Sequence, residues 1–391
     1  MKYVTFDITN KCNLRCKHCY NRNKYFFKDK YPTLNEEEIK SIISKLKTEG
    51  CEYINFLGGE PLIRNDFINI VNYCKLKGIK TLFTTNGILL SQEKYKELIE
   101  AGIESIDISL EGTEKENDFI RGKGTYKKVI NNIKAIKENF GNIDKLRISY
   151  TLTSYNYTGL FEFIRKLNVL GVKNFLIGSY INIDDNEFDT FDLNKNFKTF
   201  KIFDTIEEVI RKLSKSKLEL NIELDFRPMF VYYLRNTYGK IVHNNVLFSN
   251  CAYKKGLRYI EADGRVHPCN VYSMENLKGF DKTSYLDINC NIMDTNYNKD
   301  WARLQKCFSD MYEKEKKINN ICKKCTFLQI CEPCPFQFKD DNNYMECKCV
   351  KYKINQYKDN NNIKMEDFNY NEYIKSLFSN QKGMDTWKNL D

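Results

Sequence analysis

Short apolar runs alternate with amphipathic segments over the first half of the chain. The apolar runs predict six β-strands, at residues 3–9, 53–57, 81–85, 105–110, 145–152 and 174–180. The segments between them have helical periodicity and predict helices near residues 33–50, 66–77, 91–101, 126–139 and 160–170. The first helix is expected to begin at Thr33, because Thr33 and Glu36 have the spacing of a capping box. Six strand–helix repeats favour a partial (β/α)6 barrel, an α/β fold, over a doubly wound sheet.

The alternation breaks after residue 180. Residues 202–213 predict an amphipathic helix, and residues 218–226 alternate like a strand. Two strands around the Asp263-Gly264 turn predict a hairpin. We therefore divide the chain into a barrel at 1–180, a bridge or substrate-contact segment at 181–250, a cysteine-rich domain at 251–352 and a tail at 353–391. Within 181–250, a bridge packed on the barrel is favoured over a dedicated peptide-binding element.

Polar and glycine residues follow several predicted strands. In a parallel barrel the chemistry collects at the carboxyl ends of the strands. The loop after residues 53–57 reads Gly58-Gly59-Glu60-Pro61, where two glycines would let the backbone approach a ligand closely. Later loops contribute four polar residues, namely Asn86, Ser109, Glu111 and Arg121. We expect these loops to form one site together with the loop after the first strand.

Composition limits the function classes. The 391 residues are 42% hydrophobic and 29% charged, and no apolar run is long enough to span a bilayer. The amino terminus lacks a signal-peptide pattern, so we expect a cytoplasmic protein and no membrane partner. The net charge of +10 comes from dispersed lysines, which argues against nucleic-acid binding. Fifteen cysteines in such a chain indicate metal centres rather than disulfides.

Three cysteines, Cys12, Cys16 and Cys19, form a C-x3-C-x2-C motif directly after the first strand. A [4Fe–4S] cluster normally takes four thiolates, so three leave one iron open for a small chelating ligand. A zinc site is the alternative for C-x2-C spacing, but no second ligand pair lies nearby. At this motif the chain resembles the radical SAM superfamily, whose signature is C-x3-C-x-φ-C, with His18 at φ. The resemblance extends over residues 1 to about 180.

The resemblance implies a partial barrel in which S-adenosylmethionine (SAM) binds the open iron and is cleaved to a 5′-deoxyadenosyl radical. It also implies roles for several loop residues. Gly58, Gly59 and Glu60 would contact the amino group of SAM, Ser109 and Arg121 its ribose and carboxylate, and His18 would lie near the adenine. Glu111 and Asn86 are further candidates, although a polar residue at a strand end can simply satisfy loop backbone groups. No general base or hydrogen donor is identified.

A second cysteine set follows the bridge. Its pattern resembles the SPASM extension of radical SAM enzymes, with one departure, because two residues rather than three separate Cys331 from Cys334. The resemblance implies two auxiliary [4Fe–4S] clusters, three in all. The first would be bound by Cys251, Cys269 and Cys334, and the second by Cys322, Cys325, Cys331 and either Cys347 or Cys349. Cys290 is a candidate fourth ligand of the first cluster; without a protein ligand there, a substrate thiolate could bind. In isolation, a zinc ribbon would also fit these cysteines.

Relatives of this architecture modify peptides or proteins. One branch matures ribosomally made peptides, and another oxidises a sulfatase Cys or Ser to formylglycine. The sulfatase branch carries an aspartate base after the last cysteine of the G-x4-C element, where this chain has Asn270. We therefore favour a peptide maturase that makes a cross-link, a thioether slightly ahead of other bonds. Formylglycine formation and peptide epimerisation are the alternatives.

The expected partners follow from that reading. They are a peptide substrate and a flavodoxin or ferredoxin as electron donor. Because we expect no leader-binding domain before the first strand, either a separate protein binds the leader peptide or the enzyme recognises the peptide through its own barrel and middle segment. An iron–sulfur or zinc redox protein without SAM chemistry is an alternative of another class. That alternative predicts that alanine at Gly59 or Arg121 leaves activity unchanged.

Overall fold

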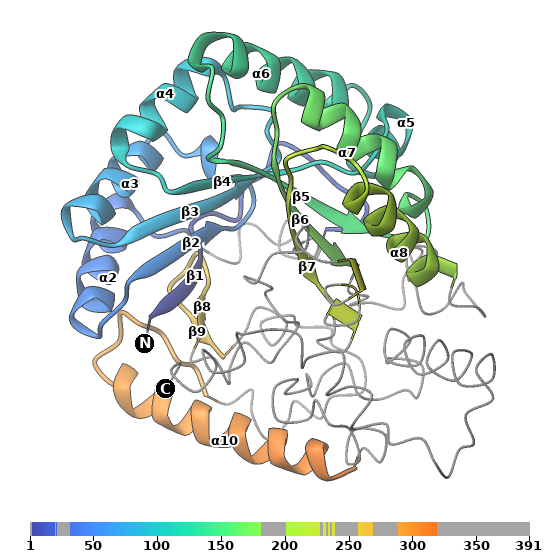
Figure 1. Ribbon diagram of the computed structural model, residues 1–391. Helices are drawn as coiled ribbons and strands as arrows, with labels where there is room; N and C mark the ends of the chain where they lie inside the picture. The colour runs from blue at the N-terminus through green and yellow to red at the C-terminus, as the bar shows by residue number, and fades with distance from the viewer. Residues whose placement is uncertain are drawn as a thin grey trace, which may run out of the picture.

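A computed structural model describes residues 2–19, 21, 32–180, 201–226, 230–231, 234, 237–238, 257–268 and 288–318. Nine strands form one curved sheet in the order β7-β6-β5-β4-β3-β2-β1-β8-β9 (Figure 1). Every neighbouring pair is parallel except the last, β8 and β9. Parallel strands in chain order with helices between them confirm the predicted α/β class.

The strands of the first half match the apolar runs closely. They are β1 (Tyr3–Asp7), β2 (Tyr53–Leu57), β3 (Lys80–Thr85), β4 (Ser105–Ser109), β5 (Leu146–Leu152) and β6 (Asn174–Ser179). Along β5, buried residues alternate with partly exposed ones, so that Ile148 is buried and its neighbours Arg147 and Ser149 are not. The buried side packs against the helices, and the other side faces the concave interior. The outer face of the sheet is therefore apolar, whereas the inner face mixes polar side chains with apolar ones such as Leu57, Leu82 and Leu176.

Helices cover the outer face of the sheet (Figure 1). They are α2 (Glu36–Thr48), α3 (Phe67–Leu76), α4 (Gln92–Ala101), α5 (Glu114–Arg121), α6 (Thr125–Phe140), α7 (Leu160–Val169) and α8 (Lys201–Ser214), with short 3-10 turns at η1 (Pro61–Ile63) and η2 (Tyr157–Gly159). The predicted cap at Thr33 is wrong. Asn35 caps α2 instead and forms a capping box with Glu38, since its side chain accepts from the N3 backbone. The sequence analysis also missed α5.

The sheet does not end at residue 180. Helix α8 follows β6, and β7 (Asn221–Asp225) pairs with β6 in parallel from Asn174↔Asn221 to Gly178↔Asp225. Helix α8 is the sixth helix of the (β/α)6 pattern, and β7 adds a further strand. The helix predicted at 202–213 and the strand predicted at 218–226 are confirmed, and they continue the alternation of the barrel instead of breaking it.

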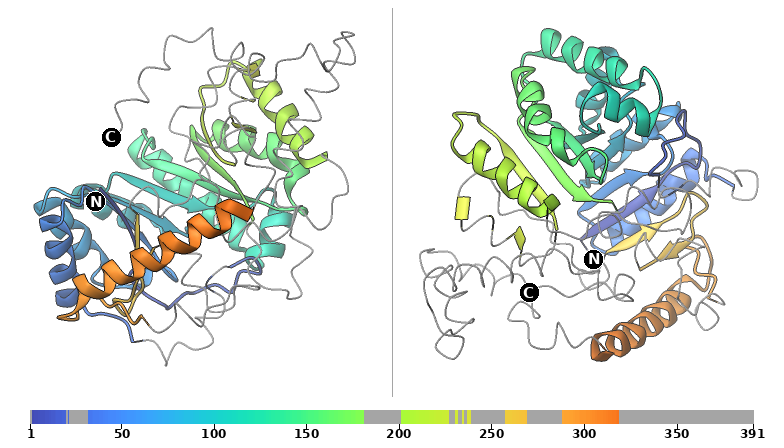
Figure 2. Two further views of the ribbon diagram at one scale, coloured as in Figure 1. Left: turned by 90° about the horizontal axis from the view of Figure 1, so that it is seen from below. Right: turned by 90° about the vertical axis from the view of Figure 1, so that its right-hand side faces the viewer.

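The hairpin predicted around Asp263-Gly264 is confirmed. The sequence analysis did not predict where this hairpin lies in the sheet. β8 (Arg258–Ile260) pairs in parallel with β1, and β9 (Val266–His267) pairs antiparallel with β8. The hairpin thus extends the barrel sheet beyond its first strand (Figure 2). Gly264 takes φ +87° at the turn, a conformation that L side chains rarely adopt.

A long helix that the sequence analysis did not predict, α10 (Tyr297–Ile318), packs near α2 and β8. Arg258 connects these elements, because its guanidinium contacts both Glu49 and the hydroxyl of Tyr297. Lys45 on α2 donates to the carbonyl oxygen of Ile292 at 2.9 Å. No helix among the described residues is long and apolar enough to cross a membrane.

Candidate active site

The cysteine loop leaves the carboxyl end of β1. Cys12, Cys16 and Cys19 are all partly exposed. Within the loop, the amide of Leu14 donates to Cys12 Sγ at 3.4 Å. The amide of Lys17 donates to the carbonyl oxygen of Ile120 at 2.8 Å and ties the loop to α5. Burial raises the pKa of the Cys12 and Cys16 thiols above the ordinary value.

The two loop glycines are needed for packing against the cysteine loop. A Cβ at Gly58 would lie 2.4 Å from the carbonyl oxygen of Thr9, and one at Gly59 would lie 2.0 Å from that of Lys11. Two backbone hydrogen bonds join the loops, from Gly59 N to Thr9 O at 2.7 Å and from Glu60 N to Lys11 O at 2.8 Å. The close approach that these glycines permit is therefore to the loop that carries the cysteines. Contact between this backbone and SAM stays a prediction.

Glu60 connects three segments from a fully buried position. Its carboxylate accepts from the hydroxyl of Thr85 at 2.7 Å, the amide of Asn86 at 2.8 Å and the amide of Leu62 at 3.1 Å. Burial raises the pKa of Glu60 to about 7. The Asn86 side chain in turn donates to Asn13 Oδ1 at 2.7 Å, so the loop after β3 also contacts the cysteine loop.

His18, Glu111 and Arg121 form a buried cluster beside Cys16. Glu111 Oε1 lies 2.5 Å from Arg121 Nη2 and 3.1 Å from His18 Nε2, and Glu111 Oε2 accepts from the amide of Thr151 at 2.8 Å. Arg121 Nη1 lies 3.7 Å from Cys16 Sγ. Burial lowers the pKa of His18, which favours the neutral imidazole. Burial alone would raise the pKa of Glu111, but the charge of Arg121 holds it below its ordinary value.

Helix α5 positions Arg121 in its last turn. Thr113 caps α5 and forms a capping box with Glu116, a Thr-x-x-Glu signal that could have predicted this helix. Asn117 was also missed; it is fully buried, accepts from the amide of Glu111 at 3.0 Å and donates to Thr125 at 2.8 Å. Nothing in a single sequence marks such an asparagine.

The remaining predicted SAM residue, Ser109, is the last residue of β4 and is paired in register with Ser149 of β5. It stands at the same edge of the sheet as the loops described above. The structure therefore brings all the predicted SAM residues to the carboxyl edge of β1 to β4.

Two buried polar atoms in this cluster have no hydrogen-bond partner, Nδ1 of His18 and Nε of Arg121. Buried polar groups are nearly always paired, so these two atoms indicate a ligand with polar groups. Among the described residues, no three His, Cys, Asp or Glu side chains converge on one metal ion. A cubane cluster takes one thiolate for each iron, so its ligands need not share one centre. The three thiols beside a buried cation fit such a cluster.

A second buried contact joins the hairpin to the cysteine loop. The Tyr259 hydroxyl contacts the carboxylate of Asp7, the last residue of β1. Asn21 Nδ2 lies 3.3 Å from the same carboxylate oxygen and 3.4 Å from the carbonyl oxygen of Gly58. The sequence analysis missed these residues, because only strand pairing between β1 and β8 brings Tyr259 next to Asp7.

Most of the predicted auxiliary ligands lie outside the described residues: Cys251, Cys269, Cys322, Cys325, Cys331, Cys334, Cys347 and Cys349. Cys290 is described and is 3% exposed, next to the short bridge between Arg265 and Asn291. Burial raises its pKa to about 12. Its role as a ligand stays a prediction. Cys51 and Cys74 are fully buried in the core, the setting of inert thiols.

Residues 6–167 match the family model described as "Radical SAM superfamily". The protein contains a radical SAM domain. Fe-coproporphyrin III synthase of Methanosarcina barkeri is 38% identical to it over 125 residues, 32% of this chain and 31% of that protein. Mycofactocin maturase MftC of Mycolicibacterium smegmatis is 32% identical over 161 residues, 41% of this chain and 40% of that protein. The chain thus spans less than half of these relatives.

The fold similarity extends beyond this radical SAM domain. Streptococcus suis SuiB bound to S-adenosylmethionine superposes with a TM-score of 0.65 at 20% identity, covering 88% of this chain and 77% of SuiB. SuiB has also been solved bound to its precursor peptide SuiA. At this identity the likeness shows a shared fold.

Proposed function

We propose that this protein is a radical SAM maturase that abstracts hydrogen from a peptide. The observation that carries the proposal is the cysteine loop beside the buried cluster of His18, Glu111 and Arg121, with its two unpartnered polar atoms. Radical SAM relatives with different substrates match the same domain, so the interior of the barrel must supply the argument for a peptide.

The cysteine loop supplies the ligands in this proposal. Cys12, Cys16 and Cys19 would hold a [4Fe–4S] cluster, and the charge of Arg121 partly offsets the rise that burial causes in the pKa of Cys16. A bound cluster and SAM would together supply a 5′-deoxyadenosyl radical. Arg121 and His18 would bind polar groups of SAM through Nε and Nδ1, while Glu111 holds both side chains in place.

The inner face of the sheet offers hydrogen-bonding side chains to a peptide, between apolar ones such as Leu57, Leu82 and Leu176. Its positions include Thr5, Asn55, Thr84, Ser149 and Thr151, which alternate with buried apolar residues. Asn55 Oδ1 is buried and has no hydrogen-bond partner, so it could accept from a peptide N–H group. Hydrogen-bonding side chains in a concave site fix orientation and provide specificity.

Several finer points stay proposals. Hydrogen abstraction is the first step toward each of three candidate products. These are a cross-link, for which a thioether is slightly favoured, a formylglycine and an epimerised residue. Two auxiliary clusters would take up the electron left on the product. A flavodoxin or ferredoxin and a separate leader-binding protein would be the partners, in the cytoplasm.

The first experiment measures 5′-deoxyadenosine formed from SAM under anaerobic conditions with dithionite. The Cys12/Cys16/Cys19→Ala protein should form none, whereas Cys74→Ala, which removes a buried core thiol, should keep wild-type activity. Formation that survives the triple substitution would exclude the proposed site.

The second experiment identifies the substrate class. A deuterated candidate peptide from a neighbouring gene and a deuterated tetrapyrrole precursor of Fe-coproporphyrin III are each incubated with enzyme and SAM. Deuterium in 5′-deoxyadenosine from the peptide alone supports peptide maturation. Transfer from the tetrapyrrole alone would overturn it.

A further inference from the structure

Lys17, between two cluster cysteines, touches an aromatic surface on α5. Its Nζ lies 3.4 Å from the centroid of the Phe119 ring, close enough for a cation–π contact. The Lys17 amide is bonded to the carbonyl of Ile120, so the contact is anchored at both backbone and side chain. The cysteine loop is therefore held at the surface of α5.

Phe119 belongs to an exposed aromatic pair. Its ring stacks on Tyr155, with centroids 4.4 Å apart, and Phe119 and Tyr155 keep 43% and 38% of their surface exposed. Lys115 is exposed one helical turn before Phe119, on the same face of α5. We call Lys17, Lys115, Phe119 and Tyr155 the cation–aromatic patch. Large aromatic side chains are enriched at protein interfaces, and lysines at the rim of an interface steer a partner of opposite charge.

The patch lies two residues along α5 from an arginine that contacts one of the cluster cysteines. Arg121 comes two residues after Phe119, and its Nη1 lies 3.7 Å from Cys16 Sγ. The cysteine loop beside the patch is basic, because residues 10–19 contain Lys11, Arg15 and Lys17 but no acidic residue, whereas α5 itself also carries Glu114, Glu116 and Asp118. A partner seated on the patch would be close to the cluster ligands and would be favoured if its own surface were acidic.

We propose that the cation–aromatic patch is the docking surface for an acidic, low-potential electron-carrier protein. The inference rests on the proposed function, which consumes one electron for each SAM cleaved. The carrier is oxidised by one electron. SAM is reduced as its C–S bond breaks to give methionine and the deoxyadenosyl radical, which then takes a hydrogen atom from the peptide. Two other readings are tested below: the aromatic pair only tethers the loop after β5, or it contacts the peptide.

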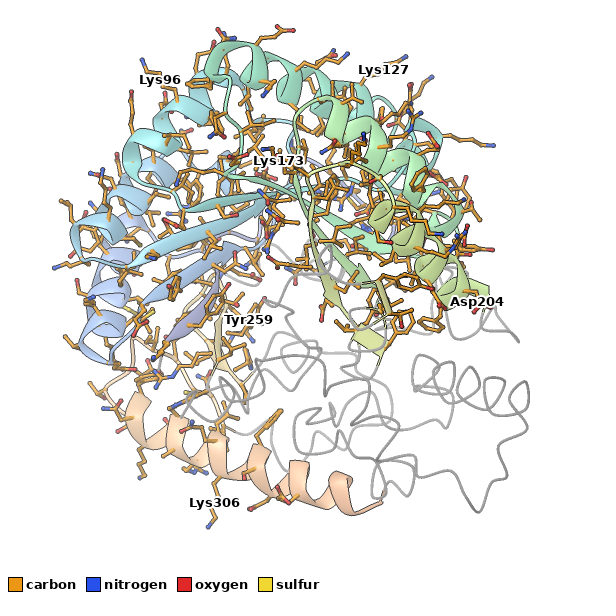
Figure 3. All side chains as sticks on the ribbon, in the orientation of Figure 1. Lys96, Lys127, Lys173, Asp204, Tyr259 and Lys306 are labelled. Atoms are coloured by element: carbon orange, nitrogen blue, oxygen red, sulfur yellow. The ribbon has the colours of Figure 1, made fainter. Side chains whose placement is uncertain are left out.

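The experiment compares two reductants on the full-length, cluster-reconstituted protein. Phe119→Ala, Tyr155→Ala and Lys115→Glu alter the patch. Phe140→Ala and Lys96→Glu are matched controls, since Phe140 is 38% exposed and packs on Tyr95, and Lys96 lies on the outer face of α4 (Figure 3). Formation of 5′-deoxyadenosine is measured with a reduced acidic flavodoxin and, separately, with dithionite.

With flavodoxin, each patch variant should lose about tenfold or more of its rate, because interface aromatics and charges dominate such contacts. With dithionite, which needs no docking surface, the patch variants should match the wild type. Both control variants should match the wild type with either reductant. Titration of oxidised flavodoxin into the cluster-reconstituted protein gives a second readout, in which the patch variants should bind correspondingly more weakly and salt should weaken wild-type binding.

Equal rates with flavodoxin in wild type and patch variants would overturn the proposal and leave only the tethering role. An equal loss with both reductants would also overturn it and would indicate an effect on the site or on the peptide. Wild-type protein that works with dithionite but not with flavodoxin or ferredoxin would overturn the docking surface as well. A wild type inactive with dithionite would instead contradict the proposed function.

Discussion

Two of the clusters among the described residues in which an arginine meets carboxylates, those of Arg147 and Arg121, differ in how completely the arginine is bonded. Arg147 on β5 donates from Nε and Nη2 to both oxygens of Asp107, at 2.8 and 2.7 Å, and from Nη1 to Glu223 at 2.5 Å. Arg121 donates to Glu111 and lies near Cys16 and His18, but its Nε has no partner. Every guanidinium nitrogen of Arg147 has a hydrogen-bond partner, so we call its cluster saturated. The Arg121 cluster is unsaturated, because one guanidinium nitrogen has no partner.

That difference separates a structural ion pair from a binding site. The Arg147 cluster links β4, β5 and β7 inside the barrel with all of its guanidinium nitrogens paired. The Arg121 cluster keeps buried hydrogen-bonding capacity at the edge where the cysteine loop lies. Since an unpaired buried donor costs free energy, a fold retains one chiefly where a ligand will pair with it. Whether every guanidinium nitrogen has a partner therefore distinguishes a structural ion pair from a binding site, whereas burial and charge do not.

The largest effect should come from breaking the saturated cluster. Arg147→Met leaves Asp107 and Glu223 without their cation, and we expect the free energy of unfolding to fall by about 3 kcal/mol. Denaturant unfolding measures the loss. SAM cleavage per folded molecule should stay at the wild-type level. A loss of cleavage with unchanged stability would reverse the roles assigned to the two clusters.

The second effect tests the unsaturated cluster. Arg121→Lys keeps the positive charge beside Glu111 but removes Nε and the planar fork, so the dissociation constant of SAM should rise about 10- to 100-fold. Binding is measured on the reconstituted protein and stability by thermal unfolding, which should change little. The matched control is Arg147→Lys, which should lower stability and leave SAM binding unchanged.

A third test uses Glu60, a buried carboxyl that accepts three hydrogen bonds. Because its folded-state pKa of about 7 lies above the unfolded value, the folded state binds more protons, and stability falls as pH rises through the window from about 4.5 to 7. Relative to Glu60→Gln, the wild type should lose about 1–3 kcal/mol between pH 5 and 8.

Glu111 should show the opposite sign. Its folded-state pKa is held below the ordinary value, so its contribution is present at neutral pH and is lost as pH falls through the folded-state pKa. For Glu60, the free energy of unfolding in urea is measured between pH 5 and 8 for the wild type and for Glu60→Gln, and the two values are compared at each pH. A difference that does not vary with pH would show that Glu60 has the same charge in both states.

The smallest effect should come from an exposed pair. Arg165 donates to Glu162 at 2.9 Å on the surface of α7, where both side chains are more than half exposed. Arg165→Ala should change the free energy of unfolding by less than about 0.5 kcal/mol and leave SAM cleavage unchanged. Thermal unfolding in low and high salt checks this. A loss near that of Arg147→Met would mean that burial does not govern these pairs.

The sequence by itself determined the α/β class, the strands of the first half and the loops that meet at one edge. These follow from local patterns: the apolar period distinguishes strand from helix, and parallel strands must send their loops to a common side. It also identified the three cysteines that resemble the radical SAM motif, because their spacing is short enough to read in one loop.

Tertiary structure decided the rest. The place of β7 and of the β8–β9 hairpin in the sheet depends on pairing between distant segments, which no local pattern encodes. The same holds for Tyr259 at Asp7, for Gly59 against Lys11 and for the difference between Arg121 and Arg147. Sequence shows that an arginine is present, but only its three-dimensional surroundings decide whether every nitrogen finds a partner.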